Sequence, residues 1–114
     1  MLLKKYKLKS NSEITRVFKN GKTVKSSFLF LRYRPSESEI TRVAFSIGLK
    51  YSKKAVLRNQ AKRILRASSR ELIGKIKKGY DLVFYFDKNF QEPLDSKIAL
   101  EKMKSCLYSA NLLE

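Results

Sequence analysis

Residues 53–66, KKAVLRNQAKRILR, concentrate positive charge on a short stretch of chain. Six of these fourteen residues are Lys or Arg, and none is acidic. The guanidinium of Arg offers a bidentate fork to phosphate, and the ammonium of Lys a compact charge. The chemistry that this composition favours is the binding of a phosphate-rich partner.

Apolar residues recur through this segment at helical spacing and predict one long helix, over roughly residues 54–77. Leu57, Ala61, Ile64, Leu65, Ser68 and Leu72 fall within an arc about 100° wide, which we expect to face a sheet. Lys53 and Lys54 stand at the entrance to this helix. The other positions lie on the flank and far side: Arg58, Asn59, Lys62, Arg63, Arg66 and Arg70.

The charge on this helix has two interpretations. Like charges four residues apart destabilise a helix by about 0.2–0.5 kcal/mol per pair, and acids at alternate positions would remove that penalty. A solvated basic face is one interpretation, although such faces usually mix signs. We favour a phosphate-binding helix, whose positive N-terminal end near Lys53 and Lys54 adds to the attraction.

The excess charge of the whole chain is localised in the same way. The net charge is +16 over 114 residues, and residues 1–70 hold 19 Lys or Arg against three acids. Residues 71–114 hold seven of each sign. This asymmetry indicates a binding face for a polyanion. The length fits a single domain, 1–114. Residues 1–9 form a basic arm, for which a disordered terminus is the alternative, and both can hold before a polyanion binds.

The composition also argues against several classes of function. Cys106 is the only cysteine and there is no histidine, which excludes an intrachain disulfide and a multi-cysteine zinc site. A protein nuclease would need clustered carboxylates, and the acids form no persuasive cluster. We therefore expect no catalytic residue and no metal bound by the protein. No apolar run is long enough for a membrane span and no signal peptide is evident, so we expect a cytoplasmic protein.

Other segments predict the rest of the fold. Ser10 and Glu13 fit a capping box that opens a short helix, which ends near Gly21. Residues 22–34 predict a strand, broken near residues 26–27. Residues 40–49 predict a second long strand that pairs back as a hairpin. Residues 81–86, DLVFYF, predict a buried strand in which Tyr85 belongs to the core, and residues 95–112 predict a last helix.

The resulting order is α-β-β-(β)-α-β-α, where the bracketed strand allows for the break. Helices packed on one face of a mixed sheet would give an α+β fold, a two-layer α-β sandwich.

At the basic helix the sequence resembles the bacterial ribonuclease P protein subunit. Residues 55–66 carry A-V-x-R-N-x-x-K-R-x-x-R, which is long, ordered and specific. Residues 8–21, 28–31 and 42–47 resemble further parts of that family's pattern. Two residues depart from the pattern. Gln60 stands where the family has Arg, and Ile14 stands where the family has an aromatic residue. The helix entrance aligns in two ways. If residues 52–54 are the S-K-K of the motif, the entering turn is shortened and loses its glycine. We prefer the alignment that matches Lys50 to the second lysine and places Tyr51 to Lys54 in the turn, because it shortens nothing.

The resemblance implies an RNA-binding subunit of the ribonucleoprotein that removes 5′ leaders from precursor tRNA. The catalyst would be the RNA, with RNA-bound Mg²⁺, and no DNA or membrane partner is expected. It also implies a left-handed βαβ crossover. The signature helix and its entrance would contact the catalytic RNA through Lys50, Lys53, Lys54, Arg58, Asn59, Lys62, Arg63, Arg66 and Arg70.

A cleft between the first helix and the open face of the sheet would hold the leader. Aromatic rings can stack on its bases, although core packing is an alternative role for them. Phe28 and Phe30 share strand parity with Arg32, and we prefer that face for the cleft over the face of Leu29, Leu31 and Tyr33. The predicted leader contacts are Ile14, Phe18, Phe28, Phe30 and Arg32. A ribosomal or other structured-RNA-binding protein without a processing role remains the alternative.

Overall fold

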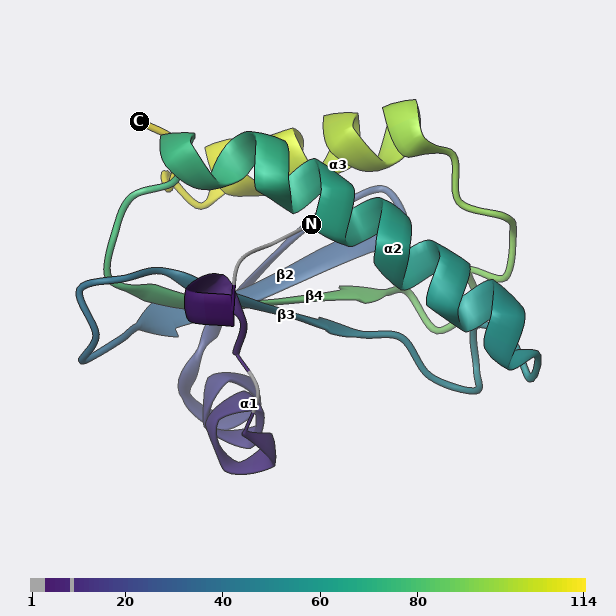
Figure 1. The fold of residues 1–114 in the computed structure, drawn as a ribbon, viewed down its shortest axis with the longest axis horizontal. Helices are drawn as coiled ribbons and strands as arrows, with labels where there is room; N and C mark the ends of the chain where they lie inside the picture. The colour runs from purple at the N-terminus through teal and green to yellow at the C-terminus, as the bar shows by residue number, and fades with distance from the viewer. Residues whose placement is uncertain (1–3, 9) are drawn as a thin grey trace.

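The computed structural model describes residues 4–8 and 10–114 (Figure 1). It confirms the α+β class and the expected order of elements. The elements are the 3₁₀ helix η1 (Lys4–Tyr6), α1 (Asn11–Asn20), β1 (Lys22–Ser26), β2 (Leu29–Pro35), β3 (Arg42–Ser46), α2 (Ala55–Leu72), the 3₁₀ helix η2 (Ile73–Lys75), β4 (Tyr80–Phe86) and α3 (Ser96–Ser109).

The four strands form one mixed sheet in the order β1-β2-β4-β3. β2 is antiparallel to both β1 and β4, whereas β3 is parallel to β4. The predicted hairpin of residues 40–49 with the preceding strand is therefore wrong, because β4 lies between them. β4 is apolar along nearly its whole length, and a strand of that kind is stable where both of its faces are covered. It takes the interior position and leaves β3 at the edge.

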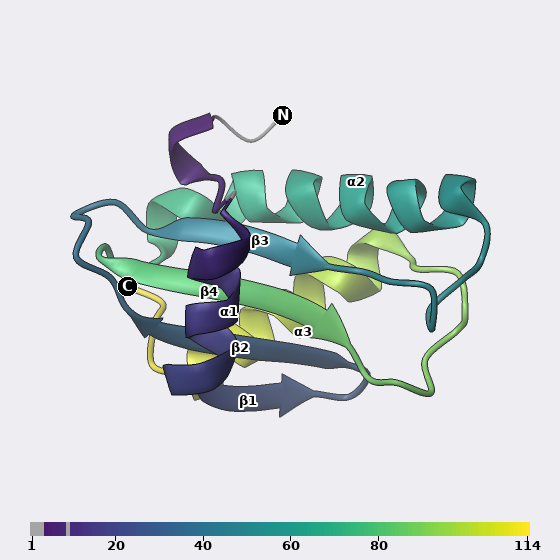
Figure 2. The same ribbon diagram turned by 90° about the horizontal axis from the view of Figure 1, so that it is seen from below.

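The connection from β3 through α2 to β4 is left-handed. In Figure 2 the helices α2 and α3 lie behind the sheet. The chain runs to the right along β3, back to the left along α2, and to the right again along β4, which lies below β3. Crossovers between parallel strands are right-handed in about 98% of cases, so this handedness was expected only from the family resemblance.

The two faces of the sheet carry different layers. α2 and α3 cover one face, whereas α1 crosses the other (Figure 1), so the expectation that all helices share one face holds only for α2 and α3. Leu29 and Leu31 point into the larger core under α2 and α3. Beneath α1 lies a smaller apolar cluster of Leu8, Val17, Ala44 and Val83.

Helix α2 packs through much of the predicted arc. Ala61, Leu65 and Leu72 are buried against the sheet and α3. Leu57 remains 38% exposed because the first turns of α2 extend past the ends of the strands (Figure 1).

The capping box predicted at α1 is only partly correct. Ser10 is the N-cap residue, but its side chain makes no capping hydrogen bond. Its Oγ lies 2.7 Å from Oγ of Ser12. The carboxylate of Glu13 forms an ion pair with Arg42 on β3 in place of the expected capping bond to the N–H of Ser10. A strong cationic partner thus outcompetes a backbone N–H for this carboxylate.

The close approach of α1 to β2 depends on Gly21. A Cβ added there would lie 2.4 Å from the carbonyl oxygen of Val17 and 2.9 Å from that of Tyr33. We predict that Gly21→Ala lowers the free energy of unfolding by about 1–3 kcal/mol, because backbone atoms must move to relieve the overlap. Chemical denaturation measures this change. Gly74→Ala is the matched control, since a Cβ at residue 74 meets nothing within 4 Å. Equal destabilisation by both changes would contradict the argument.

Candidate nucleic-acid interfaces

The first candidate surface is the basic ridge, defined as the cationic residues of α2 and its entrance turn. Seven of the nine predicted contacts are exposed, namely Lys50, Lys53, Lys54, Asn59, Arg63, Arg66 and Arg70, whereas Arg58 and Lys62 are half-buried. None of these cations has a carboxylate within 4.0 Å among residues 4–8 and 10–114. The structure therefore brings the predicted residues together along α2 and its entrance turn, and it leaves the charge of the cations uncompensated.

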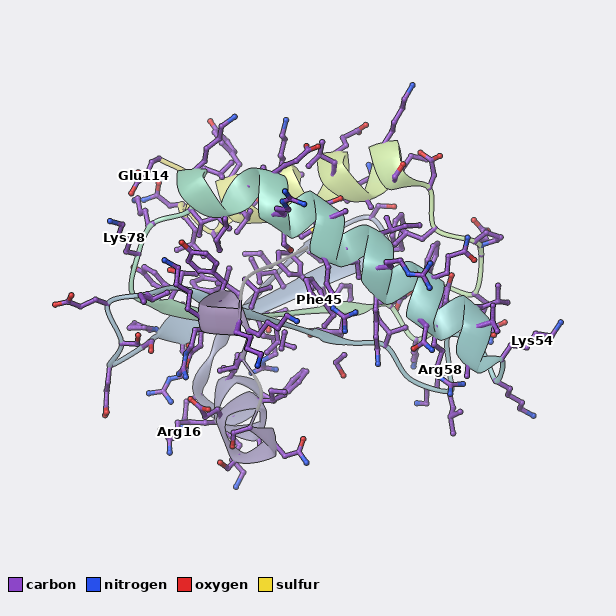
Figure 3. All side chains as sticks on the ribbon, viewed as in Figure 1. Arg16, Phe45, Lys54, Arg58, Lys78 and Glu114 are labelled. Carbon is purple, nitrogen blue, oxygen red and sulfur yellow. The ribbon has the colours of Figure 1, made fainter. Side chains whose placement is uncertain are left out.

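The entrance turn that carries Lys50, Lys53 and Lys54 is braced from two sides. Arg58 Nη1 donates a hydrogen bond of 2.9 Å to the carbonyl oxygen of Ser52. Tyr51 is buried, and its hydroxyl donates to the carbonyl oxygen of Glu92 at 3.0 Å. Gln91 Nε2 donates to the carbonyl oxygen of Lys50, also at 3.0 Å. Figure 3 shows Lys54 and Arg58 at this end of α2.

Tyr51 is a supporting residue that sequence reasoning missed. It was interpreted only as part of the turn, yet its ring packs against Phe86 and Phe90 with centroid separations of 5.0 and 5.9 Å. This aromatic packing, together with its hydroxyl bond, fixes the turn against the connection between β4 and α3. An aromatic residue inside a basic turn is the signal that could have indicated this role.

The second candidate surface depends on the position of α1, whose N-terminal end is held by an ion-pair network. Arg42 Nε and Nη2 lie 3.1 and 3.2 Å from the two carboxylate oxygens of Asp81. Arg42 Nη2 also pairs with Glu13 on α1. Burial alone would lower the pKa of Arg42, but hydrogen bonds and charges from Asp81 and Glu13 raise it above its ordinary value.

The C-terminal end of α1 is held by a second arginine. Arg32 Nη2 donates a hydrogen bond of 3.1 Å to the carbonyl oxygen of Gly21. The guanidinium carbon lies 5.8 Å from the ring centroid of Phe18, within cation–π range. The contact of Arg32 with the leader stays a prediction, and the structure shows that Arg32 supports the wall formed by Phe18.

A cavity of about 600 Å³ opens between α1, the sheet and the entrance turn of α2. We call it the aromatic cleft and define it by Phe18, Phe30, Lys50, Tyr85 and Lys88, which are among its lining residues. The ring of Tyr85 lies 5.3 Å from that of Phe18 and 5.2 Å from that of Phe30, measured between centroids. Because Lys50 also belongs to the basic ridge, the two surfaces meet at the entrance turn.

The five predicted leader contacts separate into four groups. Phe18 and Phe30 line the aromatic cleft. Ile14 packs on the small cluster beneath α1 and lines an adjacent hollow of about 210 Å³ with Lys62 and Arg66. Arg32 lies on the same face but holds α1. Phe28 does not lie on this face.

The placement of Phe28 shows why strand parity failed at that residue. Ser27 has a φ of 57°, and residues 27–28 turn the chain between β1 and β2. The ring of Phe28 therefore leaves the alternation of β2 and stacks on Phe90 at a centroid distance of 4.0 Å, next to the larger core.

Tyr85 was predicted to belong to the core, and the structure instead places it in the lining of the aromatic cleft. Its polar hydroxyl within an apolar strand was the available signal.

Two negative findings apply to the described part of the chain. No helix there is long and apolar enough to cross a membrane. No group of three or more His, Cys, Asp or Glu side chains gathers there in a way that could hold a metal ion. Within the basic arm, residues 4–6 form η1 and Leu8 is buried, while Lys9 lies outside the described residues.

Comparisons with known proteins agree with the geometry. A family model described as Ribonuclease P matches residues 2–111. The Ribonuclease P protein component of Cyanothece sp. is 34% identical over 99% of this chain and 98% of its own length. That of Caldanaerobacter subterraneus subsp. tengcongensis is 41% identical over 68% of this chain and 66% of its own length. The solved RNase P protein from Thermotoga maritima superimposes with a TM-score of 0.80 at 27% identity, covering 89% and 96% of the two chains.

The ion-pair network at α1 leads to a stability prediction. Arg42→Ala should lower the free energy of unfolding by about 3 kcal/mol, because it leaves the carboxylate of Asp81 buried and unpaired. The Asp81 side chain is only 9% exposed. Glu13→Gln, which removes the charge of the more exposed partner, should cost roughly 1 kcal/mol or less. Urea denaturation of both variants measures the difference. Equal losses would show that Asp81 does not depend on Arg42.

Proposed function

Because this chain belongs to the ribonuclease P protein family, we propose that its two surfaces divide the work of a ribonuclease P protein component. The basic ridge binds the catalytic RNA, and the aromatic cleft binds the 5′ leader of precursor tRNA. The observation that carries this proposal is the meeting of an uncompensated cationic helix with an aromatic cavity at Lys50. The alternative, a structured-RNA-binding protein without a processing role, is not favoured by the relatives named above.

The ridge has the features of a surface for folded RNA. Arg58, Lys62 and Arg66 lie at four-residue steps on one helix and place guanidinium and ammonium groups at successive turns. Groups so spaced can neutralise several phosphates of a rigid RNA helix, releasing condensed counterions on binding. Such contacts fix position and orientation, whereas they carry little sequence information.

The cleft has the features of a surface for single-stranded RNA. The faces of Phe18, Phe30 and Tyr85 can stack on unpaired bases, at about 1–3 kcal/mol per base. Lys50 and Lys88 in the same cavity supply charge for the phosphates between those bases. Mature tRNA has no leader, so contacts in the cleft favour the precursor over the product and promote release after cleavage.

The reaction itself we assign to the RNA, which would hold the Mg²⁺ that cleavage needs. The protein then acts by binding and orienting the substrate, with no active site of its own. We place this work in the cytoplasm, with precursor tRNA as substrate and without a DNA or membrane partner. Two of the carboxylates, those of Asp81 and Glu13, pair with Arg42.

Charge removal on the ridge tests the first assignment. Arg58→Ala, Lys62→Ala and Arg66→Ala should each weaken binding to a ribonuclease P RNA and reduce the salt slope of the binding constant by about one. Filter binding over a range of salt concentrations measures both quantities. Lys104→Ala on α3 is the control, because Lys104 is exposed and lies outside the ridge. Unchanged affinity and slope in all three ridge variants would refute the assignment.

Removal of one ring tests the second assignment. Phe18→Ala should weaken binding of leader-bearing precursor more than binding of mature tRNA, because only the precursor has bases to stack there. Affinities of the reconstituted complex for the two RNAs measure this ratio. Phe28→Ala is the comparison variant, since Phe28 lies with the larger core. An equal loss for both RNAs with Phe18→Ala, accompanied by a lower melting temperature, would instead support a packing role.

A further inference from the structure

We propose that a second cavity, which we call the tyrosine pocket, binds one unpaired nucleotide of an RNA strand. We define the pocket by Asn20, Lys22, Tyr33, Arg34, Lys77 and Tyr80, which are among its lining residues. The proposal rests on the proposed function only for the identity of the RNA. It adds a contact that neither the basic ridge nor the aromatic cleft provides.

The pocket lies at one end of the sheet, where β1 and β4 begin and where β2 and α1 end. Lys22 begins β1 and Tyr80 begins β4, and the register pairs Lys22 with Tyr33 and Pro35 with Tyr80. The chain just after α3 closes one side. The backbone of Lys77 is fixed there, because its N–H donates to Leu112 at 2.7 Å and its carbonyl accepts from Thr41 Oγ1 at 2.6 Å. Figure 3 shows Lys78, the neighbour of Lys77, at the end of the molecule opposite Lys54.

The charge of the pocket is wholly positive. Lys22, Arg34 and Lys77 come from three different segments, and no acidic residue lines the cavity. None of these three cations has a carboxylate within 4.0 Å in the part of the chain that the structure describes. Asp81 is the register partner of Arg34, but both of its carboxylate oxygens are bonded to Arg42. The positive charge therefore remains available to an anion.

The walls of the pocket suit a planar ring beside that anion. Tyr33 and Tyr80 are half-buried, and each packs against the larger core while lining the cavity. A tyrosine held in this way can offer its ring to a base, as aromatic side chains do in single-strand binding sites. The amide of Asn20 can both donate and accept hydrogen bonds at a base edge.

The size of the pocket distinguishes a single nucleotide from a duplex. Its volume is about 300 Å³, half that of the aromatic cleft. A base must leave its stack to enter a cavity of this kind, so the bound strand is unpaired. The pocket has no lining residue in common with the aromatic cleft and contains none of the nine predicted ridge residues. It is thus a separate point of attachment, and the strand can come from the catalytic RNA or from the precursor.

Site-directed crosslinking tests the proposal and identifies the source of the strand. Asn20→Cys places a thiol at the pocket, where a photoreactive azidophenacyl group can be attached. Cys106 does not interfere, because it is fully buried and its burial raises the pKa of the thiol to about 11. The labelled protein is assembled with ribonuclease P RNA alone, with precursor tRNA alone, and with both. Ser105→Cys, at an exposed position on α3, carries the same label as the control.

Efficient crosslinks from the Asn20→Cys label to one defined unpaired region, absent from the Ser105→Cys control, would support the pocket. The RNA that carries the crosslink shows which source supplies the strand. Crosslinks no stronger than the control in all three mixtures would overturn the proposal. If the assembly forms and the ridge variants weaken it, such a result rejects only the pocket and leaves the proposed function intact.

Charge removal gives an independent readout. Lys22→Ala and Lys77→Ala should each weaken binding of the crosslinked RNA and reduce the salt slope by about one, with Lys104→Ala unchanged. Circular dichroism melting curves establish that each variant is folded. Folded variants with unchanged affinity and slope would contradict the proposal even if crosslinks were found.

Discussion

Both proposed RNA surfaces depend on how β4 divides its side chains between the two faces of the sheet. Leu82 and Phe84 enter the core beneath α2 and α3, whereas Val83 and Tyr85 face α1. The first face holds α2 by its apolar arc and so directs its cations outward. The second holds α1 at a distance that leaves an aromatic cavity. One central strand therefore sets the positions of both the basic ridge and the aromatic cleft.

The positive charge of α2 is tolerable in the free protein because the helix is held by packing. Ala61, Leu65 and Leu72 are at most 2% exposed, and burial of that kind outweighs the few tenths of a kcal/mol per like-charged pair at i,i+4. Acidic residues on α2 would remove the repulsion between its cations, but they would also remove the attraction of the helix for phosphate. A bound polyanion instead relieves it, so RNA binding should also stabilise the folded protein.

The sequence predicted what is local and periodic, and failed where distant segments compete. The spacing of apolar residues along the chain predicts the long basic helix and the order of the elements. The spacing of Lys and Arg on that helix predicts that its cations lie together. The partner of β3 could not be found in that way. A hairpin with β2 and a parallel pairing with β4 are both compatible with the same alternation of side chains along β3, and only the position of β4 in the sheet distinguishes them. Phe28 and Tyr85 were misplaced for related reasons. A turn at Ser27 interrupts strand parity, and the second face of β4 becomes a cleft only once α1 crosses it.

The most direct test is reconstitution of leader cleavage. A bacterial ribonuclease P RNA and a leader-bearing precursor tRNA are mixed at low Mg²⁺, with and without this protein, and the rate of 5′ leader release is measured. The protein should increase that rate, because its cations take over part of the charge neutralisation that Mg²⁺ otherwise provides and its cleft holds the leader. An unchanged rate, under conditions in which the protein is folded and bound to the RNA, would contradict the account.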